Sequence, residues 1–298
     1  MDELPSPLEL ATGRPGARGR ARHLAIGLEQ PDREREDWLA TEEPLELRIH
    51  APDGSRVTAA VTMRTPGNDF ELAVGFLLGE GLIASAADVR GVRYCVDRGL
   101  SEQQRFNVVN VDLARGDAEG LRRLERSFTV TSACGVCGTQ SIEALASRGV
   151  PRVAQAATID RDVLWSLPAS LREGQAVFDR TGGLHAAGLF TLDGSMVQIR
   201  EDVGRHNALD KLLGWALLGG RLPLAGHVLV LSGRASYELL QKAATAGVPI
   251  VCAISAPSSL AVAVADRFGI TLVGFLRDQQ ANVYTHPDRV ASSTAPRP

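Results

Sequence analysis

The chain of 298 residues has few cysteines, few aromatic residues and no apolar stretch long enough to cross a membrane. Its four cysteines are too few for a disulfide framework, and in a reducing compartment a close cysteine pair is more often catalytic or metal-binding. The first residues lack the charged-then-apolar order of a secretory signal. We therefore expect a cytoplasmic protein with no membrane partner.

The sequence also lacks a strong charge of either sign. A net charge of −3 provides no general attraction to nucleic acid, so no nucleic-acid partner is expected. One local run of arginines among glycine and proline could contact RNA or an acidic partner, although a solvated tail is the simpler interpretation: Arg14, Arg18, Arg20 and Arg22. With 44% hydrophobic and 22% charged residues, the composition is that of a soluble globular protein.

Cys134 and Cys137 form the most informative pattern that is present. Each is followed by glycine, and a helix-like run over 139–146 comes next. A thiol just before a helix feels the positive end of the helix dipole, which favours the nucleophilic thiolate. The glycines allow a large partner to approach the sulfur. The pattern predicts sulfur chemistry, and the spacing alone is compatible with a disulfide oxidoreductase, a metal loop, a sulfur carrier or an inert loop.

Changes of pattern along the chain predict its organisation. Alternating apolar residues at 43–50 and 56–63 indicate two strands. Further along, short apolar runs from 227–231 to 270–275 alternate with helical segments such as 205–218 and 259–268, as in sheets buried on both faces. We expect a 1–22 flexible tail, a 23–125 small strand-rich domain, a 126–163 cysteine loop and connecting segment, a 164–292 α/β domain with a mostly parallel sheet edge, and a 293–298 tail.

Loops after three expected strands lie where sheets of this class bind ligands. Ser232 and Arg234 offer a hydroxyl and a guanidinium to an anion, and the serine-rich segment 255–259 repeats the arrangement. The third loop suits a planar, phosphorylated heterocycle and comprises Phe275, Leu276, Arg277, Asp278, Gln279 and Gln280. Each loop taken alone is more simply interpreted as an ordinary helix-capping turn, and it is the presence of three on neighbouring strands that makes a ligand site an equal interpretation.

The segment 200–211 is dense in charge where a helix is expected to begin, with Asp202 as its natural cap. Side chains of its first turn can face the ligand edge of the sheet: Arg205, His206 and Asn207. The alternative is a solvated helix face with Asp210 and Lys211 directed outward.

His185 invites comparison with the signature of zinc deaminases. The deaminase glutamate position is occupied by Ala187, and the cysteine pair precedes the histidine, so deaminase catalysis is not expected. A zinc site of Cys134, Cys137 and His185 is conceivable, yet no second cysteine pair exists and we assign no metal ligand. The other two cysteines lie in expected strands and are interpreted as core residues: Cys95 and Cys252.

Four segments in this order resemble the FdhD family, the accessory sulfur carriers of formate dehydrogenase: 132–138, 181–187, 201–211 and 282–287. The resemblance extends over about residues 35–292. It implies a layered α/β fold similar to cytidine deaminases, with Ala187 in place of their catalytic glutamate, and a homodimer. It also implies that Cys134 carries a persulfide with Cys137 as its partner, and that 275–280 contacts the guanine dinucleotide of a pterin cofactor.

The function implied by this resemblance is that of a sulfurtransferase. The chain would accept sulfur from a cysteine desulfurase and pass it to the molybdenum cofactor before that cofactor enters the catalytic subunit of formate dehydrogenase. The cofactor, Mo-bis(molybdopterin guanine dinucleotide), would be a bound substrate, and no permanently bound metal is expected. The alternatives are a nucleotide- or zinc-binding redox module and a docking scaffold that transfers no sulfur.

Overall fold

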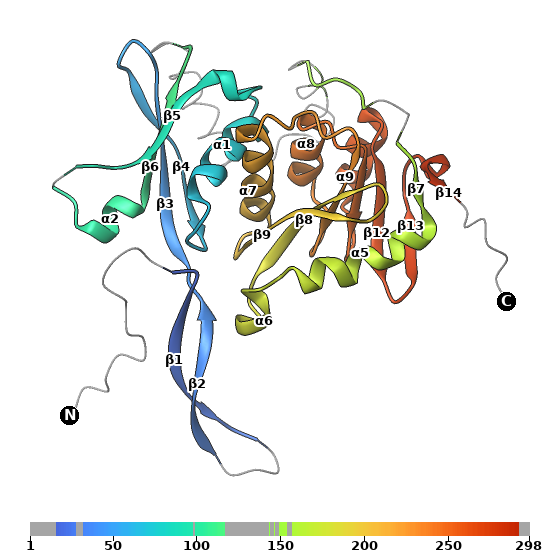
Figure 1. The fold of residues 1–298 in the computed structure, drawn as a ribbon, viewed down its shortest axis with the longest axis horizontal. Helices are drawn as coiled ribbons and strands as arrows, with labels where there is room; N and C mark the ends of the chain where they lie inside the picture. The colour runs from blue at the N-terminus through green and yellow to red at the C-terminus, as the bar shows by residue number, and fades with distance from the viewer. Residues whose placement is uncertain are drawn as a thin grey trace.

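The computed structural model describes residues 16–27, 32–97, 99–116, 143, 146, 149–153 and 157–291. Figure 1 shows two units side by side, one around α1 and β3–β6 and one around α7–α9, with a two-stranded ribbon projecting from the first. Within these residues, no helix combines the length and the apolar character needed to span a bilayer. The structure is mixed α/β with several sheets.

The first unit is a four-stranded sheet in the order β4-β3-β6-β5. Its strands are β3 (Glu43–His50), β4 (Arg56–Arg64), β5 (Val89–Tyr94) and β6 (Val108–Leu113), with α1 (Asp69–Gly79), the short η1 (Ala86–Asp88) and α2 (Glu102–Phe106) between them. The alternation at 43–50 and 56–63 therefore identified a strand pair, which turns at Gly54 with a φ of 85°. Leu45, Leu47 and Ile49 alternate into the core on β3.

The projecting ribbon differs from the sequence-based expectation of a flexible tail over 1–22. Arg18–Ala25 forms β1, which pairs antiparallel with β2 (Arg33–Ala40) over eight residues. The guanidinium carbons of Arg18 and Arg20 each lie 4.8 Å from the centroid of the Trp38 ring. These cation–π contacts and the backbone ladder order a segment whose composition alone indicated disorder.

The second unit is a six-stranded sheet in the order β13-β12-β11-β10-β8-β9. Three central strands are parallel, and the outer ones are antiparallel to their neighbours. The strands are β8 (His185–Thr191), β9 (Met196–Asp202), β10 (His227–Leu231), β11 (Ile250–Ala253), β12 (Thr271–Arg277) and β13 (Gln280–Val283).

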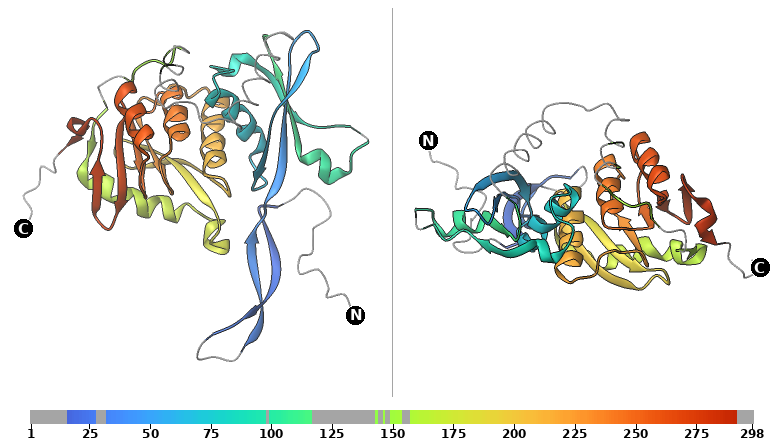
Figure 2. Two further views of the ribbon diagram at one scale, coloured as in Figure 1. Left: turned by 180° about the vertical axis from the view of Figure 1, so that it is seen from behind. Right: turned by 90° about the horizontal axis from the view of Figure 1, so that it is seen from above.

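Helices cover both faces of this sheet, as Figure 2 shows in its two views. Alternate strand residues pack against α7 (Arg205–Leu218), α8 (Tyr237–Thr245) and α9 (Ser259–Phe268) on one face and against α5 (Arg161–Glu173) on the other. The remaining elements are β7 (Ile159–Asp160), α6 (Phe178–Thr181), η2 (Pro287–Arg289) and β14 (Val290–Ala291). Burial on both faces explains why the strands read as continuous apolar runs.

Helices α1 and α7 join the two units (Figure 1). They cross so closely that a Cβ on Gly75 would lie 2.6 Å from the carbonyl carbon of Asp210, and a Cβ on Gly214 would lie 2.6 Å from that of Glu71. Only glycine permits this approach of two backbones. One continuous cluster of buried side chains runs across the joint, from Leu72 on α1 to Leu213 on α7.

Buried charges reinforce the joint. Lys211 Nζ lies 2.6 Å from Asp202 Oδ2 and donates to the backbone oxygen of Thr65 at 2.8 Å, while the N–H of Thr65 donates to Asp202 at 3.1 Å. Asp210 pairs with Lys242 at 2.8 Å. Asp210 and Lys211 are 2% and 1% exposed, so the solvated-face interpretation of this helix is wrong. Buried charges occur in such places when they are paired.

Candidate functional site

The hairpin formed by β12 and β13 carries the first candidate site. Strand β12 continues to Arg277, and the turn to β13 is made by Asp278 and Gln279 with φ values of 52° and 55°. Phe275 also has a positive φ, 55°, at a shift of register between Gly274 and Arg277. An aromatic residue in this conformation costs on the order of 1–3 kcal/mol and is held by its surroundings. The Phe275 N–H donates to Ser255 O at 3.2 Å.

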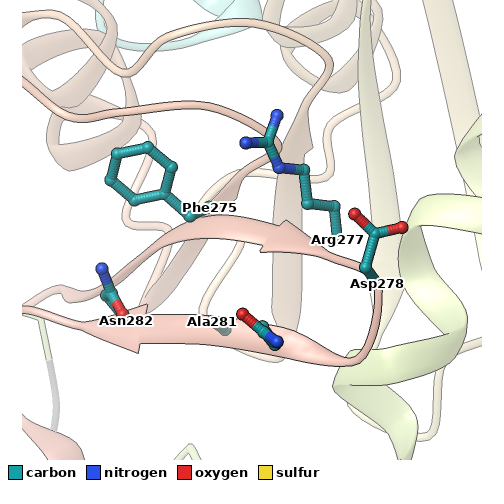
Figure 3. A pocket seen from close by; sticks show the side chains of 6 residues that line it. Phe275, Arg277, Asp278, Ala281 and Asn282 are labelled. Carbon is teal, nitrogen blue, oxygen red and sulfur yellow. The ribbon is translucent and has the colours of Figure 1, made fainter.

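A cavity of about 370 Å³ lies on this hairpin and is lined by Phe275, Arg277, Asp278, Gln280, Ala281 and Asn282. Figure 3 shows Phe275 and Arg277 on the same side of β12, with Asp278 at the turn and Asn282 on β13. Arg277 is exposed, so its guanidinium is available to an anion. An aromatic ring, a guanidinium and side-chain amides together can hold a ring system that carries phosphate.

The structure brings four of the six residues expected here to one cavity. Leu276 is fully buried in the core against α5, and Gln279 is not among the lining residues. The sequence interpretation missed Ala281 and Asn282, because it placed no strand after residue 275. Alternation along β12 could have assigned Leu276 to the core, since neighbours of a strand residue point to the opposite face.

Ser232 and Arg234 do not reach this cavity. Ser232 follows β10, and its hydroxyl oxygen accepts a hydrogen bond from the N–H of Ala186 at 2.8 Å. Arg234 is exposed and lines neither of the two cavities described here. The three loops chosen from the sequence do share the carboxyl edge of the sheet, as the parallel strands β10–β12 require.

Ser232 lines a second cavity, of about 560 Å³, on the α5 face of the same edge. Its wall comes from α5, the segment leading to β8, and the ends of β10 and β11: Pro168, Leu171, Arg172, Gln175, Phe178, Gly182, Gly183, Leu184, His185, Ser232 and Ile254. Burial, and next the positive charge of Arg205, lower the pKa of His185 below its ordinary value. The imidazole of His185 is therefore uncharged at neutral pH. Sequence reasoning considers His185 only as a possible zinc ligand.

The first turn of α7 approaches α8 at this edge. His206 Nε2 lies 3.3 Å from the hydroxyl oxygen of Ser236 and 3.5 Å from a carboxylate oxygen of Glu238. The hydrogen bond with His206 is the main reason that the pKa of Glu238 falls to about 2. Of the three first-turn residues, Asn207 instead turns to the joint and donates to Met63 O at 2.7 Å.

Cys134 and Cys137 lie outside the residues that the structure describes. The other two cysteines are core residues as expected: Cys95 is 9% exposed and Cys252 is fully buried. Desolvation raises the pKa of the Cys252 thiol to about 12, so it is not a nucleophile. No group of three or more potential metal ligands is found among the described residues.

Comparison with known proteins links this architecture to one family. The model of the FdhD/NarQ family matches residues 40–291. A protein of Mycolicibacterium paratuberculosis named sulfur carrier protein FdhD is 50% identical over 277 residues, which cover 92% of this chain and 98% of the relative. A protein of Mycobacterium tuberculosis with the same name is 52% identical over 261 residues, covering 86% of this chain and 92% of the relative.

A solved structure gives the same result. The crystal structure of a formate dehydrogenase accessory protein from Desulfotalea psychrophila is similar to this chain with a TM-score of 0.68 and 25% sequence identity. The similarity covers 91% of this chain and 98% of that chain.

Proposed function

Because the chain belongs to the FdhD/NarQ family, we propose that it is a sulfur carrier for the maturation of formate dehydrogenase. Its Cys134 accepts a sulfur atom from a cysteine desulfurase. The protein then transfers this sulfur to Mo-bis(molybdopterin guanine dinucleotide) before that substrate enters the catalytic subunit of formate dehydrogenase. The observation that carries the proposal is the 50% identity to a sulfur carrier over 92% of this chain.

The proposed chemistry uses two thiols. The Cys134 thiolate attacks the outer sulfur of the desulfurase persulfide, the S–S bond of that persulfide breaks, and the desulfurase cysteine leaves as a thiolate. Cys137 then either relays the persulfide or acts as the resolving thiol. In the second case its thiolate attacks the inner sulfur, a Cys134–Cys137 disulfide forms, and the outer sulfur leaves as sulfide to the metal of the substrate. A thiol reductant returns both cysteines to their reduced form.

The cavity on the β12–β13 hairpin supports the binding half of the proposal. Both side chains line the cavity, and we expect Arg277 to pair with a phosphate of the substrate and the ring of Phe275 to contact its nucleobase. Ser232 and Arg234 would then act farther along the same sheet edge. Replacing Arg277 by alanine is expected to weaken GMP binding without preventing persulfide formation. Unchanged affinity, measured by isothermal titration calorimetry, would remove Arg277 from the site.

The transfer half is tested by intact-protein mass spectrometry after incubation with a cysteine desulfurase and cysteine. A gain of one sulfur atom that is removed by reductant is expected for the natural protein and not for Cys134→Ala. In cells, Cys134→Ala is expected to abolish activation of formate dehydrogenase. Normal activation by a folded Cys134→Ala variant would refute the carrier mechanism and favour a docking scaffold, whereas tightly bound zinc after purification would favour a metal-dependent module.

Three finer features belong to the same proposal. The six-stranded sheet is a cytidine-deaminase-like scaffold, in which Ala187 removes the proton shuttle of a deaminase. The working assembly is a homodimer, and the protein acts in the cytoplasm beside its desulfurase and dehydrogenase partners.

A further inference from the structure

The second cavity, beside α5, has the size and composition of a small-molecule site. At about 560 Å³ it is larger than the cavity on the hairpin, and it falls within the usual range of ligand pockets. Leu171, Leu184 and Ile254 supply apolar wall, and Phe178 supplies an aromatic ring. Neither acidic residue nor lysine is among the lining residues, so the cavity is suited to an uncharged ligand.

Its one charged lining residue is already neutralised. The guanidinium of Arg172 lies 2.6 Å from a carboxylate oxygen of Asp179 and 4.5 Å from the centroid of the Phe178 ring. Arg172 therefore holds the outer side of Phe178 and fixes the orientation of its ring. Both side chains of this ion pair are about half exposed, so the pair is a surface contact at the rim of the cavity.

Gln175 indicates what kind of ligand the cavity takes. The residue is 4% exposed and lines the cavity, and its side chain makes no hydrogen bond to any described residue. Its amide atoms are open to the cavity and are available to a ligand. A primary amide donates and accepts hydrogen bonds in one plane, so its natural complement is a ring edge that carries a donor beside an acceptor.

Two further polar groups of the cavity are also uncharged. The pKa of His185 is lowered by burial, so its imidazole can accept or donate a hydrogen bond as a neutral ring. The hydroxyl of Ser232 accepts from Ala186 N–H and retains its own proton for donation. An amide, an imidazole and a hydroxyl between apolar walls recognise a polar heterocycle by its edge rather than by charge.

The two cavities are neighbours along the sheet edge. Ile254 lines the second cavity, and the next residue, Ser255, accepts the N–H of Phe275 from the first. The N–H of Ser255 donates to Gly233 O at 3.4 Å, beside Ser232. Phe275 on β12 and Ser232 after β10 are thus separated by two strand spacings, or roughly 10 Å. Because Leu276 faces α5, its neighbours Phe275 and Arg277 face away from α5, and a ligand that occupies both cavities has to pass over the carboxyl edge of the sheet. A ligand with two ring systems joined by phosphates has the length and flexibility for this course.

We propose that the second cavity binds a fused 2-amino-4-oxopyrimidine ring through Gln175, His185 and Ser232. Guanine and pterin share this ring, with its adjacent carbonyl acceptor and N–H donor. The choice between these two rings rests on the proposed function. In that function, the guanine nucleotide of the cofactor occupies the cavity on the hairpin, and the pterin of the cofactor occupies the second cavity. The cofactor would then lie across β10–β12 with its pterin end beneath α5.

Titration of the full chain with two separate probes tests this inference. Neopterin binding is followed by quenching of pterin fluorescence, and GMP binding is followed by calorimetry. Gln175→Leu retains the shape of the side chain but removes its amide, and is expected to weaken neopterin binding about tenfold while leaving GMP binding unchanged. Gln198→Leu makes the same replacement on β9, outside the cavity lining, and is the matched control for both probes.

A second variant of Gln175, together with thermal melting, distinguishes a loss of binding from a folding defect. Gln175→Glu retains the size of the side chain and places a carboxylate against the ring carbonyl, so it is also expected to weaken neopterin binding at least tenfold. Thermal melting establishes that the variants are folded.

The possible outcomes distinguish a failure of this inference from a failure of the sulfur carrier function on which it rests. If Gln175→Leu loses GMP binding and retains neopterin binding, the second cavity still binds a 2-amino-4-oxopyrimidine ring, but that ring is guanine and not pterin. Unchanged binding of both probes by folded Gln175 variants, or no neopterin binding by the natural protein, would overturn the inference. The carrier function is judged independently, by persulfide formation on Cys134 and by GMP binding to Arg277→Ala.

Discussion

Replacing Gly75 by alanine is expected to destabilise the joint between the two units. The new Cβ would lie 2.6 Å from the carbonyl carbon of Asp210 and 2.9 Å from the backbone nitrogen of Gly214, whereas real Cβ contacts almost never fall below 3.0 Å. The obstacle is backbone rather than a flexible side chain, so α1 and α7 must separate by on the order of 1 Å. That separation loosens the buried leucines on both helices.

The cost is set by two opposing effects. Overpacking of a well-packed core costs about 1–3 kcal/mol or more, and a loss of contact across both helices places this case at the upper end. Alanine regains at most about 1 kcal/mol through its higher helix propensity. We expect a net loss of about 2 kcal/mol. With an unfolding entropy of roughly 2.1 cal/mol/K per residue, this loss lowers the melting temperature by about 3 °C.

Differential scanning calorimetry of Gly75→Ala, Gly214→Ala and the double variant measures the effect. Both replacements obstruct the same crossing, so helices already separated by one should accommodate the other, and the double variant should lose less than the sum of the two. Gly226→Ala is the control, because a Cβ there meets nothing within 4 Å. A melting temperature within about 1 °C of the natural protein for Gly75→Ala, or full additivity, would refute the reasoning.

Three other changes are predicted from the structure. Leu276→Ala should cost about 2–5 kcal/mol in urea unfolding, whereas Arg277→Ala should leave stability nearly unchanged, because only Leu276 is buried; equal losses would contradict the assignment. Cys252 should resist iodoacetamide at pH ~8 in the folded protein, since its pKa is raised to about 12, and should react in urea. Because the pKa of Glu238 is lowered to about 2 from 4.5, its stabilising contact with His206 is present above pH 4.5 and lost on acidification toward 2. Melting curves of Glu238→Gln should therefore differ from those of the natural protein by no more than about 1 kcal/mol near neutral pH and converge in acid, and a constant difference would be inconsistent with this titration.

The joint between the two units depends on specific buried ion pairs and not only on apolar packing. Lys211 contacts Asp202 at the end of β9 and the backbone of Thr65 from the first unit. Removing one partner would leave a buried charge uncompensated, which typically costs 3–5 kcal/mol. The segment 200–211 therefore attaches the α/β unit to the strand-rich unit through the same helix whose first turn reaches the ligand edge.

Local pattern was sufficient for much of the fold. The expected helices over 205–218 and 259–268 coincide with α7 and α9, and the expected strand over 227–231 coincides with β10. These elements have strong periodicity and clear caps, such as Ser258, whose side chain accepts from Ala261 N–H. By contrast, β1 was missed because arginine and glycine carry no strand signal; its order comes from pairing with a distant partner.

The candidate site was predictable to the same extent. Phe275 and Arg277 line a cavity at the edge that the sequence predicts, because loops after parallel strands meet at one edge whatever the packing around them. Leu276 and Gln279 do not line that cavity, because the bulge in β12 and the hairpin to β13 decide which side chains share a face. Gln175 carried no signal, since an amide in a loop is ordinary until the fold places it in the wall of a cavity.

The sequence by itself determined the family and much of the order of strands and helices, and it predicts sulfur chemistry at Cys134 and Cys137, because these depend on residue type and on spacing along the chain. Only the tertiary structure decided that Gly75 and Gly214 face each other, that Asp210 and Lys211 are buried, and that Gln175, His185 and Ser232 line one cavity. Those facts depend on contacts between segments far apart in the chain. Such contacts are set by the packing of whole elements, which no local pattern records.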